Sequence, residues 1–350
     1  MSEPFGFGII GAGIISAWHA AGIEAHPDGR LVAVASRSRE RAEKFAAEHT
    51  CAVMDDWREM INRDDIQAVC ICTPSGLHAE QSIAAACAGK HVLVEKPMAI
   101  TLRECNEMIG AARANGVKLG VIFQKRTDEA PNRLKKGVED GVFGRIFFGD
   151  ASIKYWRSQA YYDSGDWRGT WALDGGGCSM NQGIHGIDLL LYIMGDVESI
   201  YAKTDTVAHT IEVEDIAIAL LRYRNGAYGR LQTATAVNPG QGIYIEVNGT
   251  LGTASLADET ITGWAVSDSK EKLAVETVAG AEAKRSAAAS SATSFATRGH
   301  IIQVANLISA VRTGENLICS GEEGRRSVHL IMALYESARR GEEVKLDELI

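Results

Sequence analysis

The sequence lacks a basic excess, a membrane-length apolar run and a paired set of cysteines. Its 36 Lys and Arg residues face 45 Asp and Glu residues, so no surplus positive charge is available to bind a nucleic-acid backbone. Apolar runs such as LLLYIM are far shorter than the roughly 20 residues that cross a bilayer. The seven cysteines include no CxxC spacing, which argues against a disulfide framework or a metal site. The first residues, MSEPFGFGII, lack the basic region of a signal peptide, so we expect a cytoplasmic protein without nucleic-acid or membrane partners.

What is present predicts two folded domains. The chain has 350 residues, and domains average about 150. Over residues 1–123, short apolar runs alternate with helical patterns, which predicts a dinucleotide-binding Rossmann domain with a parallel sheet. Over residues 124–350, strand-like runs mostly follow one another without helices, and helical patterns at 299–314 and 324–341 close the chain. This predicts an α/β domain with an open, mainly antiparallel sheet, and residues 279–293, rich in Ala and Ser, read as a surface loop.

The sharpest local motif is GAGIIS at residues 11–16, between the first strand and the first helix. In that context Gly11 allows a tight turn, and Gly13 lets the backbone approach a pyrophosphate at the helix N-terminus. A glycine-rich turn without a ligand is the alternative. The predicted phosphate-binding residues are Gly11, Ala12, Gly13, Ile14 and Ile15.

The end of the second strand bears on the choice of dinucleotide. NAD-binding folds usually place an acid there, but this chain reads VAVASRSRER. Ser36, Arg37 and Arg41 could instead bind a 2′-phosphate through charge-assisted hydrogen bonds. NADP(H) is therefore favoured over NAD(H), although a solvated basic start to a helix would look the same.

Two further motifs follow the fourth and fifth predicted strands, where open α/β sheets bind ligands. These are CTPSGLH at residues 72–78 and VLVEKPMAI at residues 92–100. A lysine directly after a buried strand favours a cleft, with an ordinary surface lysine as the alternative. The candidates are Thr73, Pro74, Ser75, His78, Glu95 and Lys96.

A third region, residues 153–177, holds six aromatic residues in a chain that is 7% aromatic. Aromatic rings can stack on a sugar, and Arg157 and Arg168 could bind a carboxylate or phosphate. Packing in the core or at a subunit interface is the alternative reading.

Together, GAGIIS, TPSGLH, EKP and GIHGID resemble the Gfo/Idh/MocA family of sugar and cyclitol oxidoreductases, in order and spacing and over nearly the whole chain. The resemblance implies that Lys96 faces the nicotinamide and the reacting carbon, and that His185 accepts or donates the proton. It also implies that the second domain binds substrate and forms a homodimer or homotetramer through its sheet. In cyclitol-oxidising members an aspartate lies four residues before the histidine, and here that position is Asn181, which argues against an inositol substrate.

The combination of FQKR, WRGTW, DGGG and NQGIHGID looks most like the branch that oxidises N-acetylated sugar-nucleotide uronic acids. The resemblance adds Gln124, Trp167 and Arg168 to the cofactor site. The predicted substrate-binding residues are Lys96, Arg126, Tyr155, Arg157, Asn181, Gln182 and His185. Two rival functions are a glycoside hydrolase that uses bound NAD and a non-catalytic, dinucleotide-sensing regulator. The presence of both Lys96 and His185 favours an enzyme, but it does not separate an oxidoreductase from a hydrolase.

Overall fold

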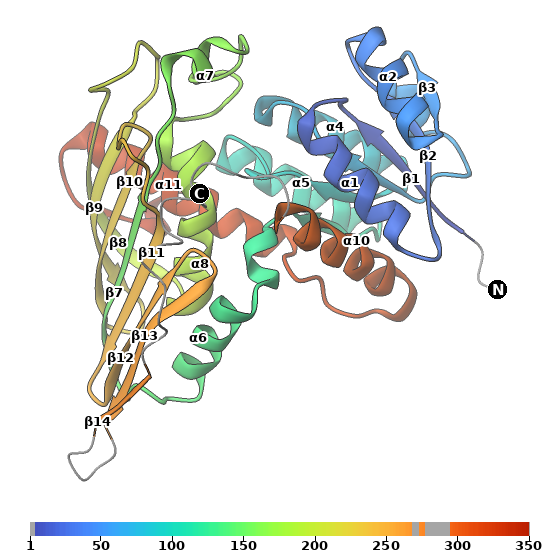
Figure 1. The fold of residues 1–350 in the computed structure, drawn as a ribbon. Coiled ribbons are helices and arrows are strands. Elements are labelled where there is room, and N and C mark those ends of the chain that lie inside the picture. The colour runs from blue at the N-terminus through green and yellow to red at the C-terminus, as the bar shows by residue number, and fades with distance from the viewer. Residues whose placement is uncertain (1–3, 268–272, 277–294, 350) are drawn as a thin grey trace. The chain divides into compact units, whose positions relative to one another are not determined.

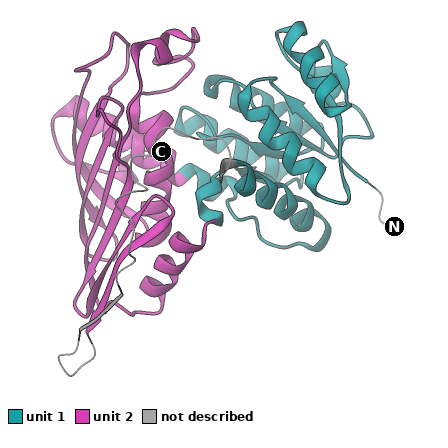
Figure 2. Ribbon diagram, in the orientation of Figure 1, with its two compact units in different colours: residues 1–127, 293–325 teal, residues 128–292, 326–350 magenta. Residues whose placement is uncertain are grey.

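The computed structural model describes residues 4–267, 273–276 and 295–349 (Figure 1). Within these ranges no helix is long and apolar enough to cross a membrane. The chain divides into two compact units, residues 1–127 with 293–325 and residues 128–292 with 326–350 (Figure 2).

Strands and helices alternate through the first unit, as the apolar periodicity predicts. Its elements are β1 (Phe5–Ile10), α1 (Ile14–Ala25), β2 (Gly29–Ala35), α2 (Arg39–His49), β3 (Ala52–Met54), α3 (Trp57–Met60), β4 (Ala68–Ile71), η1 (Ser75–Leu77), α4 (His78–Cys87), β5 (His91–Val94), α5 (Leu102–Ala114), β6 (Leu119–Val121), η2 (Gln124–Thr127) and α10 (Phe295–Thr313). The strands form a parallel sheet in the order β3-β2-β1-β4-β5-β6. The order reverses between β1 and β4, so the carboxyl ends of these two strands form the edge where such sheets bind ligands.

The helix α10 comes late in the chain but packs against α1 of the first unit. Gly22 makes the close approach possible, because a Cβ there would lie 3.0 Å from Cγ2 of Val304 and 3.2 Å from the carbonyl oxygen of His300. The sequence predicts this helix within the second domain, residues 124–350, whereas the structure places it in the first unit. An amphipathic pattern shows that one face is buried, but it does not show which sheet or helix covers that face.

The second unit begins with a helix and is built around a large sheet. Its elements are α6 (Glu129–Glu139), β7 (Ile146–Lys154), α7 (Gln159–Asp163), the π-helical η3 (Cys178–Gly183), α8 (Ile184–Met194), β8 (Val197–Asp205), β9 (Ile216–Tyr223), β10 (Tyr228–Ala234), β11 (Gly242–Gly249), β12 (Gly252–Ala257), β13 (Thr260–Ser267), β14 (Leu273–Glu276), α11 (Gly321–Arg340), β15 (Val344–Lys345) and η4 (Leu346–Glu348). The first residues of α11 belong to the first unit.

The sheet of the second unit has the order β14-β13-β12-β11-β7-β10-β9-β8-β15. Neighbouring strands are antiparallel except β7 and β10, which are parallel. α8 packs on one face, against β7 and β11. Gly186 lets it approach, since a Cβ there would lie 2.5 Å from Cγ1 of Ile153. The predicted fold class, a parallel Rossmann sheet plus an open and mainly antiparallel sheet, is thus confirmed.

The buried helix that precedes β8 begins with a turn wider than an α-helix. Residues 178–183 form the π-helical turn, and the α-helix follows and ends at Gly195, which has φ +84°. The predicted surface loop at 279–293 lies outside the described residues.

Candidate functional site

The glycine turn after β1 has the geometry that a pyrophosphate needs. Gly11 has φ +105°, and a Cβ there would lie 2.6 Å from the carbonyl oxygen of Cys72, so a larger residue does not fit. A Cβ on Gly13 would meet no described atom within 4 Å, and no side chain caps the N-terminus of α1 at this residue. Ile14, next in the chain, is 81% exposed. An open glycine, an uncapped helix N-terminus and an exposed apolar side chain together fit the phosphates of a bound dinucleotide.

At the end of β2, three nearby arginines differ in their partners. Arg39 donates to the carboxylates of Glu43 and Asp55. Arg37 and Arg41 are exposed, and neither forms an ion pair with any residue that the structure describes. Ser36 Oγ accepts the backbone N–H of Ser38 at 3.3 Å. Two positive charges beside a hydroxyl are therefore available to an anion.

His78 joins the loop after β4 to the loop after β5. Its ring is 1% exposed, with Nε2 lying 2.9 Å from the carbonyl oxygen of Thr73 and Nδ1 lying 2.8 Å from that of Pro97. Burial lowers the pKa of His78. The side chain of Thr73 donates to Oε1 of Gln81 at 2.6 Å, and Ser75 is also buried. His78, which the sequence places in the cofactor site, thus binds two loops together.

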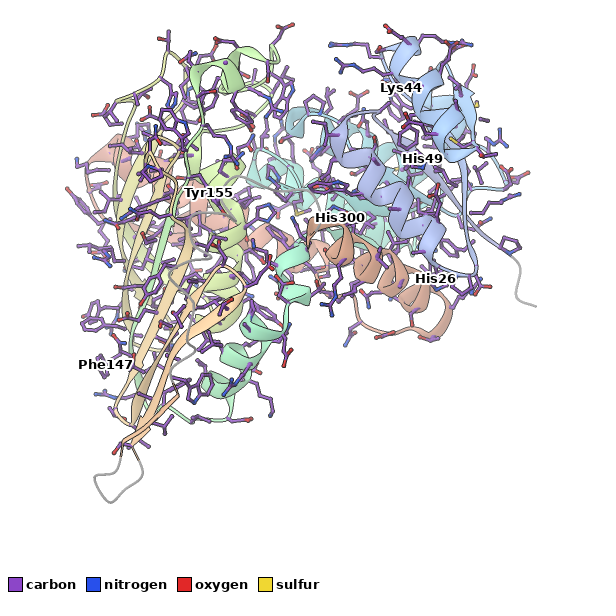
Figure 3. All side chains as sticks on the ribbon, in the orientation of Figure 1. His26, Lys44, His49, Phe147, Tyr155 and His300 are labelled. Carbon is purple, nitrogen blue, oxygen red and sulfur yellow. The ribbon has the colours of Figure 1, made fainter. Side chains whose placement is uncertain are left out.

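Glu95 occupies a buried site formed by three donors. Oε1 accepts hydrogen bonds from Nε2 of His19 on α1 at 3.0 Å and from Nε2 of His300 on α10 at 2.9 Å, and His300 is labelled in Figure 3. Oε2 accepts the backbone N–H of Lys96 at 3.3 Å. Burial alone would raise the pKa of Glu95, but the two imidazole hydrogen bonds hold this pKa well below its ordinary value. The carboxylate is therefore ionised at neutral pH.

No motif of the sequence indicates His19 or His300 as site residues. His19 lies on the buried face of α1 outside any motif, and burial lowers its pKa. His300 is 205 residues from Glu95, so only the tertiary fold reveals the cluster. The side chains of His19, Glu95 and His300 are also close enough to hold a metal ion, because their ligand atoms lie within 4.8 Å of one another. The two hydrogen bonds account for this spacing without a metal.

Two predicted residues lie in η2. Gln124 Oε1 is buried and has no hydrogen-bond partner among the described residues, which leaves an acceptor for a ligand amide. Arg126 is 3% exposed and donates to Oε2 of Glu323 at 3.0 Å. The guanidinium that the sequence assigns to substrate is thus engaged in an ion pair of its own unit, with a glutamate whose side chain is 41% exposed.

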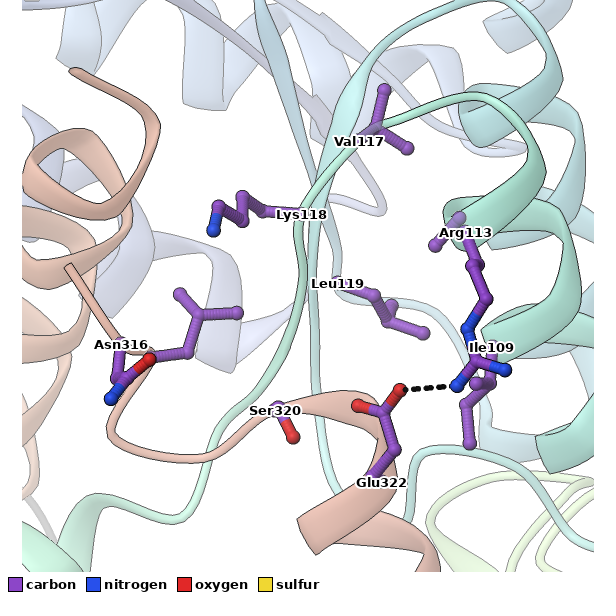
Figure 4. A pocket seen from close by; sticks show the side chains of 10 residues that line it. Ile109, Arg113, Val117, Lys118, Leu119, Asn316, Ser320 and Glu322 are labelled. Atoms are coloured by element: carbon purple, nitrogen blue, oxygen red, sulfur yellow. Dashed lines mark hydrogen bonds and ion pairs between the residues drawn. The ribbon is translucent and has the colours of Figure 1, made fainter. Parts of the chain in front are cut away.

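A cavity of about 280 Å³ lies elsewhere in the first unit, beside α5 and β6 (Figure 4). Arg113 and Glu322 form an ion pair across its wall. None of the predicted site residues is among the ten described residues that line it. It is therefore separate from the candidate site.

In the second unit, a chain of hydrogen bonds connects the predicted substrate residues. Asn181 Nδ2 donates to Oδ1 of Asp174 at 2.5 Å, and Asn181 Oδ1 accepts from Nε2 of Gln182 at 2.9 Å. Gln182 Oε1 in turn accepts from Arg157 at 2.7 Å. The carboxylate that is missing at position 181 is thus present one hydrogen bond away, in Asp174. His185 follows two residues after the π-helical turn, in the first turn of α8.

Tyr161 brings the two arginines of this region together. The guanidinium carbons of Arg157 and Arg168 lie 5.3 and 4.3 Å from the centre of its ring. Arg168 also donates to the Tyr161 hydroxyl at 2.5 Å and lies over the ring of Trp167 at 4.5 Å. Within the described ranges neither arginine pairs with a carboxylate, so this cluster carries two uncompensated positive charges. Burial raises the pKa of the neighbouring Tyr155, which stays neutral.

Glu214 fixes the main chain that leads to the π-helical turn through hydrogen bonds. Its carboxylate accepts the backbone N–H groups of Gly177 at 2.8 Å and Ser179 at 2.9 Å, and the hydroxyl of Tyr335 at 2.9 Å. A Cβ on Gly177 would lie 1.8 Å from the carbonyl oxygen of Glu214, and one on Gly176 would lie 2.1 Å from the Tyr335 hydroxyl. The DGGG motif thus reflects close packing. Burial raises the pKa of Glu214.

The neighbouring acid, Asp215, fixes a second loop. It accepts the backbone N–H groups of Val207, Ala208 and His209, and also the His209 ring Nδ1 at 2.8 Å. The other ring nitrogen of His209 lies 2.8 Å from the carbonyl oxygen of Arg157. The sequence analysis assigns no role to Glu214, Asp215 or His209, which belong to no motif of recognised chemistry, or to Asp174, although Asp174 begins the DGGG motif.

Comparison with known proteins identifies the family. Residues 5–123 match the oxidoreductase family with an NAD-binding Rossmann fold, and residues 132–255 match the GFO/IDH/MocA C-terminal domain. The uncharacterized oxidoreductase YrbE of Bacillus subtilis is 31% identical over 73% of this chain and 74% of its own. The scyllo-inositol 2-dehydrogenase (NADP(+)) IolU of the same species is 47% identical over 112 residues, 31% of this chain and 34% of its own.

Among solved structures, the WlbA dehydrogenase from Bordetella pertussis, in complex with NADH and UDP-GlcNAcA, is 33% identical with a TM-score of 0.88. The match covers 99% of this chain and 98% of that one. The chain therefore belongs to the Gfo/Idh/MocA family of oxidoreductases, as the motifs predict.

Proposed function

We propose that this protein transfers hydride between a nicotinamide dinucleotide and a ring carbon of a sugar that carries a carboxylate or phosphate. The proposal that the sugar is anionic rests on the cluster of Arg157, Tyr161 and Arg168. Its two positive charges have no acidic partner among the described residues. Guanidinium groups bind carboxylate and phosphate through paired, charge-assisted hydrogen bonds. The similarity to a dehydrogenase solved with UDP-GlcNAcA supports a sugar-nucleotide uronic acid as the substrate class.

The cofactor, when bound, supplies C4 of its nicotinamide ring as hydride acceptor or donor. His185 takes the proton of the substrate hydroxyl during oxidation and returns it during reduction. Lys96 stabilises the negative charge that develops on the substrate oxygen. Asn181 and Gln182 orient the sugar through the hydrogen-bond chain that ends at Asp174 and Arg157.

We propose further that NADP(H) is preferred. Arg37 and Arg41 lack carboxylate partners within the described ranges, whereas Arg39 between them has two. A 2′-phosphate would balance the charges of Arg37 and Arg41, as Glu43 and Asp55 balance the charge of Arg39. The local similarity to an NADP(+)-dependent dehydrogenase supports this preference.

We also propose that two copies associate through the open sheet face of the second unit. Tyr201 lies opposite Leu220 across β8 and β9, and Tyr228 lies beside Phe148 across β10 and β7. All four are exposed, and Ile218 extends the same face. Light scattering after size-exclusion chromatography should report a dimer or tetramer, and Leu220→Lys with Ile218→Lys should reduce its size. A wild-type monomer would contradict this proposal.

The decisive test is a cofactor titration followed by a substrate panel, read at the absorbance band of the reduced nicotinamide. The panel contains uronic acids, sugar-nucleotide uronic acids and the matched neutral sugars. We expect reduction of the cofactor by the anionic members. Release of a free sugar without net reduction would indicate a redox-assisted hydrolase, and cofactor binding without any reaction would indicate a sensor.

A further inference from the structure

The segment that carries Lys96 is held by a buried cluster, defined as His19, Glu95 and His300 (the His-Glu-His cluster). The two imidazoles come from helices α1 and α10, and both donate to one oxygen of the carboxylate. The second oxygen accepts the backbone N–H of Lys96. The carboxylate is therefore fixed on one side by two helices and fixes the main chain of Lys96 on the other.

We propose that this cluster positions Lys96 for the chemistry, so that α10, far along the chain, takes part in the active site. The inference rests on the proposed function, because it assigns His19 and His300 as positioning residues for its lysine. Both rings are fully buried, at 0% exposure, so neither can touch a substrate. Their effect reaches the reaction only through Glu95.

The neighbourhood explains why the cluster has this composition. An ionised carboxylate in the interior is stable only if donors replace the water it has lost. His19 and His300 supply those donors, each through its Nε2 atom. Trp18 packs edge-on against His300 at 5.4 Å, and the rings of His19 and His300 meet at 5.1 Å, which fixes the orientation of both imidazoles. The other carboxylate oxygen, Oε2, accepts the backbone N–H of Lys96.

The test compares leucine and glutamine at each histidine, in the full-length protein. Gln can place an amide N–H near the position of Nε2, whereas Leu fills the space without a donor. We expect His19→Leu and His300→Leu to lower kcat about a hundredfold, the scale of a small misplacement of a reacting group, with little change in KM. We expect the Gln variants to retain most of the lost activity. His49→Leu, which breaks the hydrogen bond between His49 and Glu24 elsewhere in the same unit, is the control and should leave kcat unchanged.

Two measurements do not depend on turnover. Affinity for the reduced dinucleotide, followed by its fluorescence, should be the same in all variants, because none alters the glycine turn. Acetylation of Lys96 by an amine-selective ester, followed by mass spectrometry, should be faster in the Leu variants than in wild type or the Gln variants, since the released segment exposes its amine.

The outcomes separate this inference from the proposed function. If wild type oxidises no sugar, the proposed function fails, and the acetylation rates still test the cluster. Wild-type kcat and acetylation in both Leu variants would overturn the positioning role, as would equal defects in the Leu and Gln variants. Stoichiometric metal in the purified protein, lost together with activity on chelation, would show instead that the three side chains are ligands.

Discussion

Two buried glutamates, one in each unit, show how the same side chain can serve different purposes. Glu95 is surrounded by two imidazoles and one backbone N–H, and its pKa lies well below the ordinary value. Glu214 is surrounded by backbone N–H groups and the Tyr335 hydroxyl, and its pKa is raised because burial outweighs those hydrogen bonds. The first arrangement maintains a charge beside Lys96. The second fixes the main chain that leads to His185.

The largest effect is expected from substitution of Lys96, which follows the ionised Glu95 in the chain. We expect Lys96→Met to lower turnover by about 10²–10⁴-fold, the usual contribution of a group that assists proton transfer. Cofactor affinity should change little, because the glycine turn and Ser36 are untouched. Steady-state kinetics and a fluorescence titration measure the two effects. Unchanged turnover would exclude the proposed role of Lys96.

A second test addresses the second unit, where Arg157 and Arg168 have no carboxylate partner among the described residues. We expect Arg157→Gln to raise KM for an anionic sugar by about 10–100-fold, since a hydrogen bond to a charged group contributes about 1.5–3 kcal/mol. The matched neutral sugar is the control, because it makes no such contact. An equal rise for both sugars would mean that Arg157 supports the hydrogen-bond chain through Gln182 and does not bind the anion.

The two glutamates should also differ in how pH affects stability. Glu95 has a lowered pKa, so its stabilising contribution is present above its ordinary pKa of 4.5 and is lost as the pH falls through the lowered value. Glu214 has a raised pKa, so the native state gains stability as the pH falls through that raised value toward 4.5. We expect the destabilisation by Glu95→Gln, about 1–3 kcal/mol near neutral pH, to shrink on acidification. The destabilisation by Glu214→Gln should grow over the same direction of pH change.

Denaturant unfolding of both variants and wild type, at matched pH values, measures these differences. Titrating groups that do not interact with either glutamate contribute equally to variant and wild type and cancel in the comparison. If the destabilisation by Glu95→Gln and the destabilisation by Glu214→Gln changed in the same direction with pH, the contrast between the two sites would be contradicted.

The smallest effect is expected at the end of β2, where the charges are exposed. We expect Arg37→Gln combined with Arg41→Gln to reduce the preference for NADP(H) over NAD(H) by about tenfold, because exposed ion pairs contribute about 1 kcal/mol or less each. Arg39→Gln is the control, since its charge is already balanced by Glu43 and Asp55. A preference that is unaffected by the double substitution would remove these arginines from the cofactor site.

The sequence is enough to predict most of the fold and the motif-based part of the candidate site. The strand–helix alternation, the glycine turn and the EKP segment each depend on residues close together in the chain, and such patterns are visible without coordinates.

The supporting networks could not be predicted, because their members come from distant parts of the chain. His300 reaches Glu95 only because α10 packs on α1, and Tyr335 reaches Glu214 across 121 residues. The ion-pair partner of Arg126, Glu323, is likewise 197 residues away and has no signal in the local sequence. The wide turn at 178–183 also has no local signature, because hydrogen bonds from Gly177 and Ser179 to Glu214 shape its start.

The crowding at Gly176 and Gly177 has a consequence for how such an enzyme could acquire a new substrate. Any side chain at these two positions would collide with Tyr335 or with the main chain at Glu214. Substitution of either glycine is therefore not tolerated by the packing of the second unit. The stretch from Tyr155 to Arg168, by contrast, is only partly covered and carries its chemistry on long side chains. Selection or directed evolution toward a different sugar should therefore accumulate its changes in that stretch and leave the glycines intact.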